Sequence, residues 1–259
     1  MMTRWEAKLG IVLACGLLAF PAAATAQKTL ALDPDLLANS DALKVRQGVR
    51  TKFGEYAQVS SRIGPLFIKT TNPIFLSFER IRTKQKFSFV IKGAGPETAT
   101  VQAAQNISSE ELREYTDSSH VSIGDEINPK YSNLVATILL DGDVERPWTL
   151  ILNVKTRWPV LREETKAAFL TDGQRKIVMA PVTSDPPGAA PSRTPALGYE
   201  FSEGDRTLGA VQYYGGGIFG ANKCIVYLRR DLEPRMRLLL AATMAAILQS
   251  KANAQVAYE

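Results

Sequence analysis

Residues 238–248 read Leu-Leu-Leu-Ala-Ala-Thr-Met-Ala-Ala-Ile-Leu, and Thr243 is the only polar residue among them. The preceding segment Asp231–Pro234 is a helix start signal, because acidic residues stabilise a first turn and proline is tolerated there. A helix that rests on a sheet has one polar face, whereas these apolar residues continue all the way round. At about 16 Å the run is far shorter than a bilayer core. The sequence therefore predicts a helix over 231–250 that is buried on every side and surrounded by sheet, with a membrane-dipping or partner-binding helix as the alternative.

Most of the remaining chain shows the period of two that is typical of half-buried antiparallel strands. The alternating or β-rich runs are Ile74–Arg80, Lys86–Ile91, Leu134–Leu140, Trp148–Lys155, Ile177–Met179, Leu208–Tyr214 and Cys224–Arg229. Asp141-Gly142 and Asp172-Gly173 lie between such runs and favour tight turns. We predict a mainly β (α+β) fold, an antiparallel closed barrel or sandwich of roughly ten to twelve strands around or against the C-terminal helix.

Two stretches interrupt this pattern. Gly93–Asn133 is polar and contains Ser108-Ser109-Glu110-Glu111, which is a candidate helix start. Pro181–Pro195 holds five prolines and predicts a surface loop without strands. Near the start of the chain, residues 27–50 are polar with scattered leucines and are predicted to form an N-terminal segment that is either a short helix or an ordered arm. Residues 51–259 are predicted to form a single β-rich domain.

The first 26 residues have the three parts of a secretory signal peptide. A positively charged start is followed by the uncharged apolar run Leu9–Phe20, and residues 24–26 are small, as a signal peptidase requires. We therefore expect cleavage between Ala26 and Gln27, which gives an exported protein that is periplasmic or secreted. A buried N-terminal helix is one alternative. A lipid anchor at Cys15 is another, because the residues before it are similar to a lipobox.

The composition restricts the chemistry that this chain can perform. Its 259 residues include 31 Lys and Arg, 26 Asp and Glu, one His and two Cys, and 45% are apolar, as in globular proteins. The single histidine excludes multi-histidine metal sites and leaves any Ser-His or Cys-His mechanism one candidate base. Without the signal peptide 29 basic and 25 acidic residues remain, a net +4 that is too spread out to indicate nucleic acid binding. Cys224 then has no disulfide partner and is predicted to be a buried small hydrophobe.

Three motifs have both a chemical and a simpler interpretation. Gly215–Gly220 matches G-x-G-x-x-G, but a strand-like segment follows instead of the helix that a dinucleotide site needs, so a hairpin loop is favoured. His120 has serines and an aspartate beside it, but sequence neighbours do not usually reach triad geometry, so an exposed loop histidine is favoured. Asp141, Asp143 and Glu145 carry ligands for Ca²⁺, but the full ligand series is missing and a solvated turn is favoured.

Four arginines, Arg229, Arg230, Arg235 and Arg237, gather around the start of the predicted helix. Arginines in a first helical turn oppose the helix dipole, at a cost of roughly 0.3–1 kcal/mol each. This placement motivates the hypothesis that they bind an anion such as a lipid phosphate. The alternative is that they pair with nearby carboxylates such as Asp231.

Asp205–Val211, a glycine-rich loop and Ile225–Pro234 lead directly into the apolar helix. This order, over about 50 residues, resembles the end of tubby-like domains, which include plant LURP-one proteins and phospholipid scramblases. The resemblance implies an antiparallel barrel threaded by a C-terminal helix. A cysteine-rich segment and a full-length C-terminal span, both features of scramblases, are absent, so lipid flipping is not implied. The chain is also similar, at Arg46–Gly48, Phe53–Tyr56 and Gly198–Val211, to a group of bacterial envelope proteins.

These observations favour an exported, non-enzymatic envelope protein that binds a membrane lipid or an envelope protein. The alternative is a secreted hydrolase whose catalytic residues the sequence does not identify. No pattern indicates a metal, a cofactor, a nucleotide or a nucleic acid as a ligand.

Overall fold

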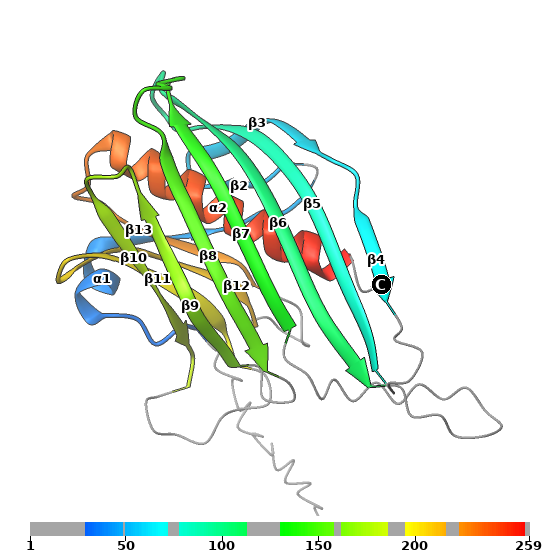
Figure 1. Cartoon of the computed structure of the whole chain (residues 1–259). Coiled ribbons are helices and arrows are strands. Elements are labelled where there is room, and N and C mark those ends of the chain that lie inside the picture. The colour runs from blue at the N-terminus through cyan, green and yellow to red at the C-terminus, as the bar shows by residue number, and fades with distance from the viewer. Residues whose placement is uncertain are drawn as a thin grey trace, which may run out of the picture.

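The computed structural model describes residues 29–48, 50–71, 78–112, 130–157, 162–185, 195–215 and 223–256. Within these ranges it contains two α-helices and thirteen β-strands (Figure 1). The helices are α1 (Pro34–Asn39) and α2 (Pro234–Val256). The strands are β1 (Ser40–Lys44), β2 (Lys52–Phe53), β3 (Tyr56–Ile63), β4 (Phe67–Thr71), β5 (Phe78–Lys92), β6 (Thr98–Leu112), β7 (Lys130–Leu140), β8 (Trp148–Arg157), β9 (Arg162–Thr171), β10 (Lys176–Thr183), β11 (Leu197–Glu203), β12 (Arg206–Tyr214) and β13 (Ile225–Arg229).

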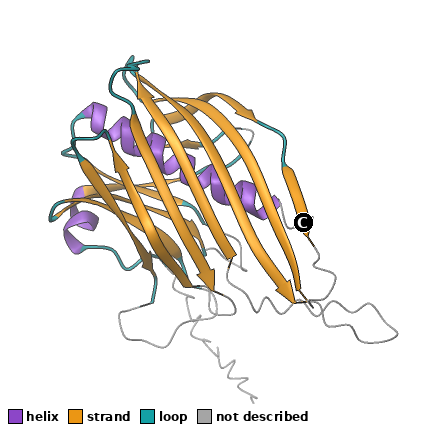
Figure 2. Cartoon of the chain, viewed as in Figure 1, coloured by secondary structure: helices purple, strands orange, loops and turns teal. Residues whose placement is uncertain are grey.

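All thirteen described strands belong to one antiparallel sheet. Its order is β1-β13-β12-β11-β10-β9-β8-β7-β6-β5-β3-β2, and β4 pairs with β5 beside β3. Strands that follow one another in the chain are therefore mostly neighbours in the sheet, while the first strand, β1, pairs with the last, β13. Figure 2 shows the sheet curving around α2. The protein is mainly β, with a nearly closed antiparallel barrel and a C-terminal helix packed against it, as the sequence predicted.

The two ends of the sheet meet at one isolated backbone bridge. The Arg46 N–H donates to the Lys52 carbonyl (2.8 Å), and the Lys52 N–H donates to the Arg46 carbonyl (3.1 Å). Arg46 follows β1 and Lys52 begins β2, so this bridge joins the first and last strands of the sheet order. One bridge fixes only a short part of the seam, and the barrel is for this reason nearly rather than fully closed.

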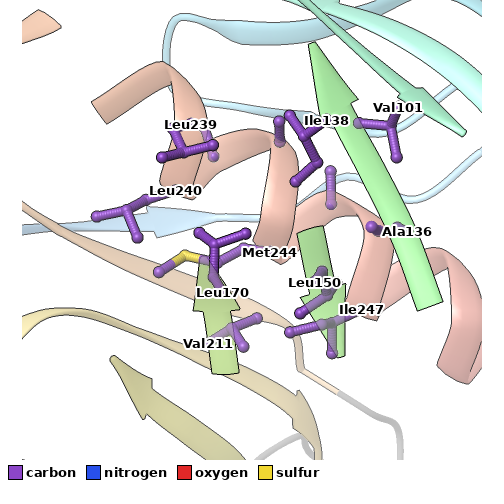
Figure 3. Packing of buried hydrophobic residues seen from close by; sticks show 14 of the residues in the cluster. Val101, Ala136, Ile138, Leu150, Leu170, Val211, Leu239, Leu240, Met244 and Ile247 are labelled. Carbon is purple, nitrogen blue, oxygen red and sulfur yellow. The ribbon is translucent and has the colours of Figure 1, made fainter. Parts of the chain in front are cut away.

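Helix α2 lies against the concave face of the sheet and supplies much of the core. Every side chain from Leu238 to Leu248 is at most 3% exposed. This includes Thr243, whose hydroxyl donates to the Leu239 carbonyl one turn earlier and so leaves no polar group unpaired. Figure 3 shows the strand residues around the helix, which include Val101, Ala136, Ile138, Leu150, Leu170 and Val211. The prediction of a helix buried on every side is confirmed.

The helix is longer than the sequence analysis predicted. It begins at Pro234 rather than at residue 231, and it continues beyond residue 250. A proline fits the first helical position because its missing N–H would have no partner there. Two amide contacts support the more polar extension: Gln105 Nε2 donates to the Ser250 carbonyl (3.0 Å), and Gln249 Nε2 donates to Asn253 Oδ1 (2.8 Å). The apolar run thus marks the buried part of the helix and not its end.

The prediction that residues 93–133 interrupt the β pattern is wrong. Most of the described part of this stretch is β6, and Ser108–Glu111 is strand rather than a helix start. The inward-facing residues in the first two thirds of β6 are buried: Ala99, Val101, Ala103, Gln105 and Ile107. Because alanine and glutamine do not stand out against polar neighbours, they hide the period of two in the sequence. Residues 113–129, including His120, lie outside the described residues.

The predicted loop at 181–195 was also placed too early. Strand β10 continues through Pro181, which pairs with Tyr199 of β11, and ends at Thr183. β10 pairs with β9 only as far as Val178, so Pro181 lies at an edge beyond that pairing, and the next backbone contact on this side is from the Ala31 N–H to the Thr183 carbonyl (2.9 Å). A proline is tolerated in a strand where its missing N–H faces such an edge. Residues 186–194 lie outside the described residues.

The described part of the predicted N-terminal arm is built into the barrel. It contains the expected short helix, α1, which Asp33 caps by accepting the Asp35 N–H (2.9 Å). Strand β1 follows at once and pairs along its whole length with β13. The residues expected to precede the β-rich domain therefore form part of its sheet.

Other local predictions are confirmed where they fall on described residues. The predicted β-rich runs lie in β5, β7, β8, β10, β12 and β13. Asp141 and Gly142 have positive φ angles of 53° and 73° after β7, and Gly173 has a φ of 92° between β9 and β10. The signal peptide with Cys15, its cleavage site between Ala26 and Gln27, and residues 74–77 of the first run lie outside the described residues.

Candidate functional site

Arg229, the first of the four candidate arginines, lies at the end of β13 and has a side chain only 8% exposed. Its guanidinium donates to both carboxylate oxygens of Asp231 (2.9 and 3.1 Å) and to Asp35 of α1. These hydrogen bonds raise the pKa of Arg229, and the bond from Arg229 is the main reason that the pKa of Asp231 falls to about 2. Arg229 therefore links α1, β13 and the turn before α2.

Arg230 points to the end of α1. Its guanidinium donates to the carbonyl oxygens of Ala38 (2.7 Å) and Ser40 (3.0 Å) and lies 3.4 Å from the Asp41 carboxylate. A cation at this place satisfies carbonyl groups that the helix leaves without a partner. Arg230, which directly follows β13, thus links that strand to the end of α1 and the start of β1.

Arg237 lies on the first turns of α2, next to the seam of the barrel. Its Nη2 atom lies 3.6 Å from Asp41 and 3.8 Å from Glu55. Tyr56 lies beside this group, and burial raises its pKa to about 12; the charge of Arg237 opposes this shift, and a hydrogen bond to Glu55 adds to it. The carboxylates around Arg237 come from both sides of the seam, so this arginine links α2 to the two strand ends that meet there.

Arg235 lines a hollow of about 390 Å³ at the start of α2, and its guanidinium lies 3.6 Å from Asp143. In the wall of this hollow Arg175 lies over the Trp148 ring (5.8 Å to the centroid) and donates two hydrogen bonds of 2.8 Å to Glu203. The full lining is Leu140, Asp143, Arg146, Trp148, Asp172, Arg175, Glu233, Arg235, Met236 and Leu239. Acidic and basic residues are equally numerous there, so the hollow has no net charge that favours an anion.

Each of the four arginines therefore has a carboxylate beside it, which is the geometry of the pairing alternative. Sequence reasoning named Asp231 as a partner, but it missed Asp35, Asp41, Glu55 and Asp143. These four come from α1, β1 and two turns that are distant in sequence, and no local pattern signals such contacts. Contact of the arginines with an anion stays a prediction.

The acidic turn after β7 uses its carboxylates to hold the backbone. Asp141 Oδ1 accepts the Thr98 N–H (2.8 Å), and Asp143 Oδ1 accepts the Glu145 N–H (3.1 Å). Among the described residues no group of three or more His, Cys, Asp or Glu side chains is placed to hold a metal ion. The solvated-turn interpretation accounts for the described contacts of this segment.

The glycine-rich segment connects two paired strands. Gly215 has a φ of 71° and its carbonyl accepts the Lys223 N–H (3.0 Å), while residues 216–222 lie outside the described residues. β12 and β13 on either side are antiparallel partners, so the segment is the hairpin connection that was favoured. Cys224 is half-buried beside it, and burial raises the pKa of its thiol to about 11. A thiol with that pKa is a poor nucleophile at neutral pH.

A second hollow, which the sequence analysis did not find, lies on the outer face of the sheet over β5, β6 and β7. Its volume is about 450 Å³ and its exposed surface is mostly apolar. We call it the outer groove; it is lined by Pro65, Phe67, Lys84, Gln85, Lys86, Ala104, Gln105, Asn106, Asn133 and Val135. Its volume is somewhat larger than that of the hollow at the start of α2.

The register of the sheet explains why this groove forms. Lys86, Ala104 and Val135 are direct cross-strand partners on β5, β6 and β7, so their side chains stand together on the outer face. Ala104 is the smallest of the three and leaves a depression between its neighbours. Phe67 of β4 stands opposite Lys84 and is 66% exposed, which raises one wall of the groove.

The apolar row continues from the groove across the outer face. Val135 pairs with Ile151, Ile151 with Phe169, and Phe169 with Val178. We call the row formed by Ala104, Val135, Ile151, Phe169 and Val178 the outer stripe. An asparagine row flanks it on one side (Asn106, Asn133 and Asn153) and a threonine row on the other (Thr137, Thr149 and Thr171). At about 4.8 Å per strand, the distance from Lys86 to Val178 along the sheet is about 24 Å.

Two lysines, Lys84 and Lys86, stand where the outer stripe begins, and neither has a carboxylate partner among the described residues. They belong to a basic region, because residues 56–92 contain seven Lys and Arg but one acidic residue. The rest of the chain has 24 basic and 25 acidic residues. A count of charged residues segment by segment would have found this basic region. The net charge of the whole chain conceals it, because the rest of the chain is nearly balanced.

Comparisons with known proteins found no significant match for this chain, whether with protein families, curated proteins or solved structures. The resemblance to tubby-like domains and to bacterial envelope proteins therefore stays a prediction. In the described ranges, no helix combines the length and the apolar character that crossing a membrane requires.

Proposed function

We propose that this protein is an exported, non-enzymatic envelope protein that binds an anionic amphiphile, with an acyl chain along the outer groove and outer stripe. Lys84 and Lys86 bind the acidic head group. The observation that carries the proposal is an apolar groove of about 450 Å³ that continues into an apolar row and starts at two lysines, which have no carboxylate partner within the described ranges.

The shape of the apolar surface supports a single chain as the ligand. Val135, in the middle of the groove, is 47% exposed although it is aliphatic. Covering such surface contributes about 25 cal/mol for each Å² removed from water. The stripe is one residue wide between polar asparagine and threonine rows, which suits a narrow acyl chain better than the broad core of a protein interface.

The charge near the groove supports an acidic head group. Lys84 and Lys86 lie on the same face of β5 and are separated by one inward-facing residue. Asn106 and Asn133 lie in the row of Lys84 and supply amide donors to the same end of the groove. Ammonium groups with neighbouring amides match both carboxylate and phosphate oxygens.

Export is part of the proposal and rests on the signal peptide pattern. We expect mass spectrometry of the exported protein to give an N-terminus at Gln27, after cleavage behind Ala26. A lipid-modified Cys15 at the N-terminus would contradict the soluble, periplasmic or secreted form and would favour an anchored one.

The binding test uses palmitate below its micellar concentration, measured by isothermal titration calorimetry with the full exported chain. Val135→Asn places a polar side chain in the stripe, and Lys84→Glu combined with Lys86→Glu reverses the charge at its end. We expect each change to weaken palmitate binding by about tenfold or more, equivalent to about 1.4 kcal/mol. Val144→Asn and Lys44→Glu are the matched controls, because both residues are exposed and lie outside the groove.

Three results would overturn this function. The groove is not the site if Val135→Asn binds palmitate as the wild type does. The lysines have no role if hexadecanol, which lacks the acid, binds as tightly as palmitate. Release of fatty acid from lysophosphatidylglycerol by the purified protein would favour the hydrolase alternative.

A further inference from the structure

The sheet has an open edge at β3 and β4. β3 pairs with β2 only at Tyr56 and Ala57, and the Gln58 N–H makes one further backbone bond in that direction. Beyond Gln58, β3 and β4 pair with β5 on one side, and no described strand pairs with their other side. We call residues 59–71 the β3–β4 edge.

This edge is nearly continuous along β5. The Gly64 N–H, between the two strands, donates to the Lys86 carbonyl (2.8 Å), and Gln85 Nε2 donates to the Gly64 carbonyl (3.3 Å). Every described residue of the edge is exposed except the two half-buried residues Gly64 and Leu66. Alternate backbone N–H and C=O groups of an edge strand point away from the sheet and are free to bind another strand.

The two faces of the edge have different chemistry. Ile63 and Ile68 lie on the inner face, because their cross-strand partners on β5 are buried, yet they are 51% and 56% exposed. On the outer face are Arg62 and Lys69, and Lys69 stands opposite Arg82. Residues 56–71 contain no Asp or Glu. The inner face of the edge is thus aliphatic, and its outer face carries the basic Arg62 and Lys69 on either side of Phe67.

We propose that the β3–β4 edge binds an extended segment of a partner polypeptide as an added strand, with acidic residues at alternate positions and aliphatic residues between them. The acidic residues face Arg62 and Lys69, and the aliphatic residues extend the row of Ile63 and Ile68. Strand addition satisfies the open backbone groups, and the alternating side chains select the segment. This proposal rests on different groups from the amphiphile site: Pro65 and Phe67 of the edge also line the outer groove, but strand addition uses the open backbone groups of β3 and β4 together with Arg62 and Lys69.

A polypeptide fits this edge better than the other two occupants. The hydrocarbon of a membrane offers no hydrogen bonds to unpaired backbone groups, each of which costs free energy there. A second copy of this chain would bring an equally basic edge, and like charges on paired strands are destabilising. An acidic segment avoids both difficulties.

The test measures binding of a labelled peptide of about eight residues, alternating Glu and Val, by fluorescence anisotropy with the full exported chain. A peptide of the same composition with Glu and Val in two blocks keeps the charge but cannot place the acids on one face. We expect the alternating peptide to bind about tenfold more tightly than the block peptide. We also expect it to protect backbone amides of residues 59–71 from hydrogen exchange.

The double variant Arg62→Glu and Lys69→Glu should lose this preference and bind an alternating Lys and Val peptide instead. Both side chains are exposed, so its melting temperature should equal that of the wild type. Lys44→Glu on β1 is the control and should bind as the wild type does.

Equal binding of the alternating and block peptides, or unchanged binding by the double variant, would overturn strand addition. Binding to phosphatidylglycerol vesicles but to neither peptide would assign the edge to a membrane. A wild-type dimer in sedimentation that the double variant alters, without peptide binding, would assign it to a second copy. Val135→Asn, which should weaken palmitate binding, should leave peptide binding unchanged. The test of strand addition can therefore succeed or fail separately from the test of the amphiphile site.

Discussion

The barrel wall around α2 and the β3–β4 edge are built from similar alternating strands but present opposite surfaces. α2 contacts β6, β7, β12 and β13, and these strands supply buried inward side chains such as Val101, Ile138 and Val211. At the β3–β4 edge, Ile63 and Ile68 also face inward and are half exposed. The pattern of apolar residues along a strand therefore does not decide burial by itself. The position of the strand relative to α2 and to its neighbours decides whether the same pattern becomes core or an accessible surface.

This difference separates the parts of the molecule that hold the fold from the parts that are free to bind. Substitutions around α2 should change stability, whereas substitutions on the edge should change binding alone.

The largest effect is expected inside α2. Leu240→Asp and Ala245→Glu place a charge on two different sides of a helix that is buried all round. An unpaired buried charge costs several kcal/mol, comparable with a whole stability of roughly 5–15 kcal/mol. Both variants should unfold or accumulate poorly, while Ile68→Asp on the edge should melt as the wild type does. A wild-type melting temperature for either helix variant would contradict enclosure.

A smaller but clear loss is expected where β12 approaches α2. A Cβ at Gly209 would lie 2.6 Å from the Tyr227 carbonyl oxygen and 2.9 Å from the terminal carbon of Met244. Gly209→Val should therefore lower the free energy of unfolding by about 1–3 kcal/mol in urea titrations. Gly95→Val is the control, because a Cβ there has no neighbour closer than 4.0 Å. Equal effects of the two changes would show that close packing against α2 is not the cause.

Acid should weaken the contacts of Arg229 before α2. The pKa of Asp231 is about 2 in the folded protein and 3.8 ordinarily, mainly because of its hydrogen bond from Arg229. A lowered pKa stabilises the fold above the ordinary value, and this contribution is lost as the pH falls from about 4 to about 2. Asp231→Asn should flatten the dependence of melting temperature on pH in this range. An unchanged slope in the variant would mean that other carboxylates control it.

The smallest effect is expected on β4. Phe67→Ser and Ile68→Ser remove exposed apolar side chains, so the free energy of unfolding should change by less than about 0.5 kcal/mol. Chemical denaturation measures this directly. A loss as large as that of Gly209→Val would show that the edge is part of the core and would remove the contrast between the two regions.

The sequence predicted the features that depend on strong local patterns. The apolar run at 238–248 predicted a buried helix, and alternating or β-rich runs predicted six of the thirteen described strands, namely β5, β7, β8, β10, β12 and β13. The hydrophobic pattern did not reveal a strand where the inward-facing residues are small or polar, as are Ala103 and Gln105 of β6. The sequence also did not predict that Pro181 lies in a strand. A strand tolerates proline only where no neighbouring strand needs its N–H, and the neighbours of a strand are known only from the sheet order.

The candidate sites were less predictable than the fold. The sequence shows the arginines near α2 as a cluster. It does not show that Asp35 and Glu55 lie beside them, because these contacts form only when the two ends of the sheet come together. The outer stripe joins Val135, Ile151 and Phe169 from three strands, and each residue looks ordinary within its own segment. A row across strands becomes visible only when the register is known.

The pairing of β1 with β13 has a consequence for how the chain folds. Ser40 stands opposite Arg229, and α2 follows only after that strand. The pairing that brings β1 into the sheet and the centre of the core therefore both depend on β13 and α2, which follow the other described strands in sequence. Contacts of such large sequence separation slow folding, because the entropy of a long loop is lost before any gain from packing. Before β13 and α2 are in place the sheet cannot close, and its exposed strand edges are then most vulnerable to wrong pairing.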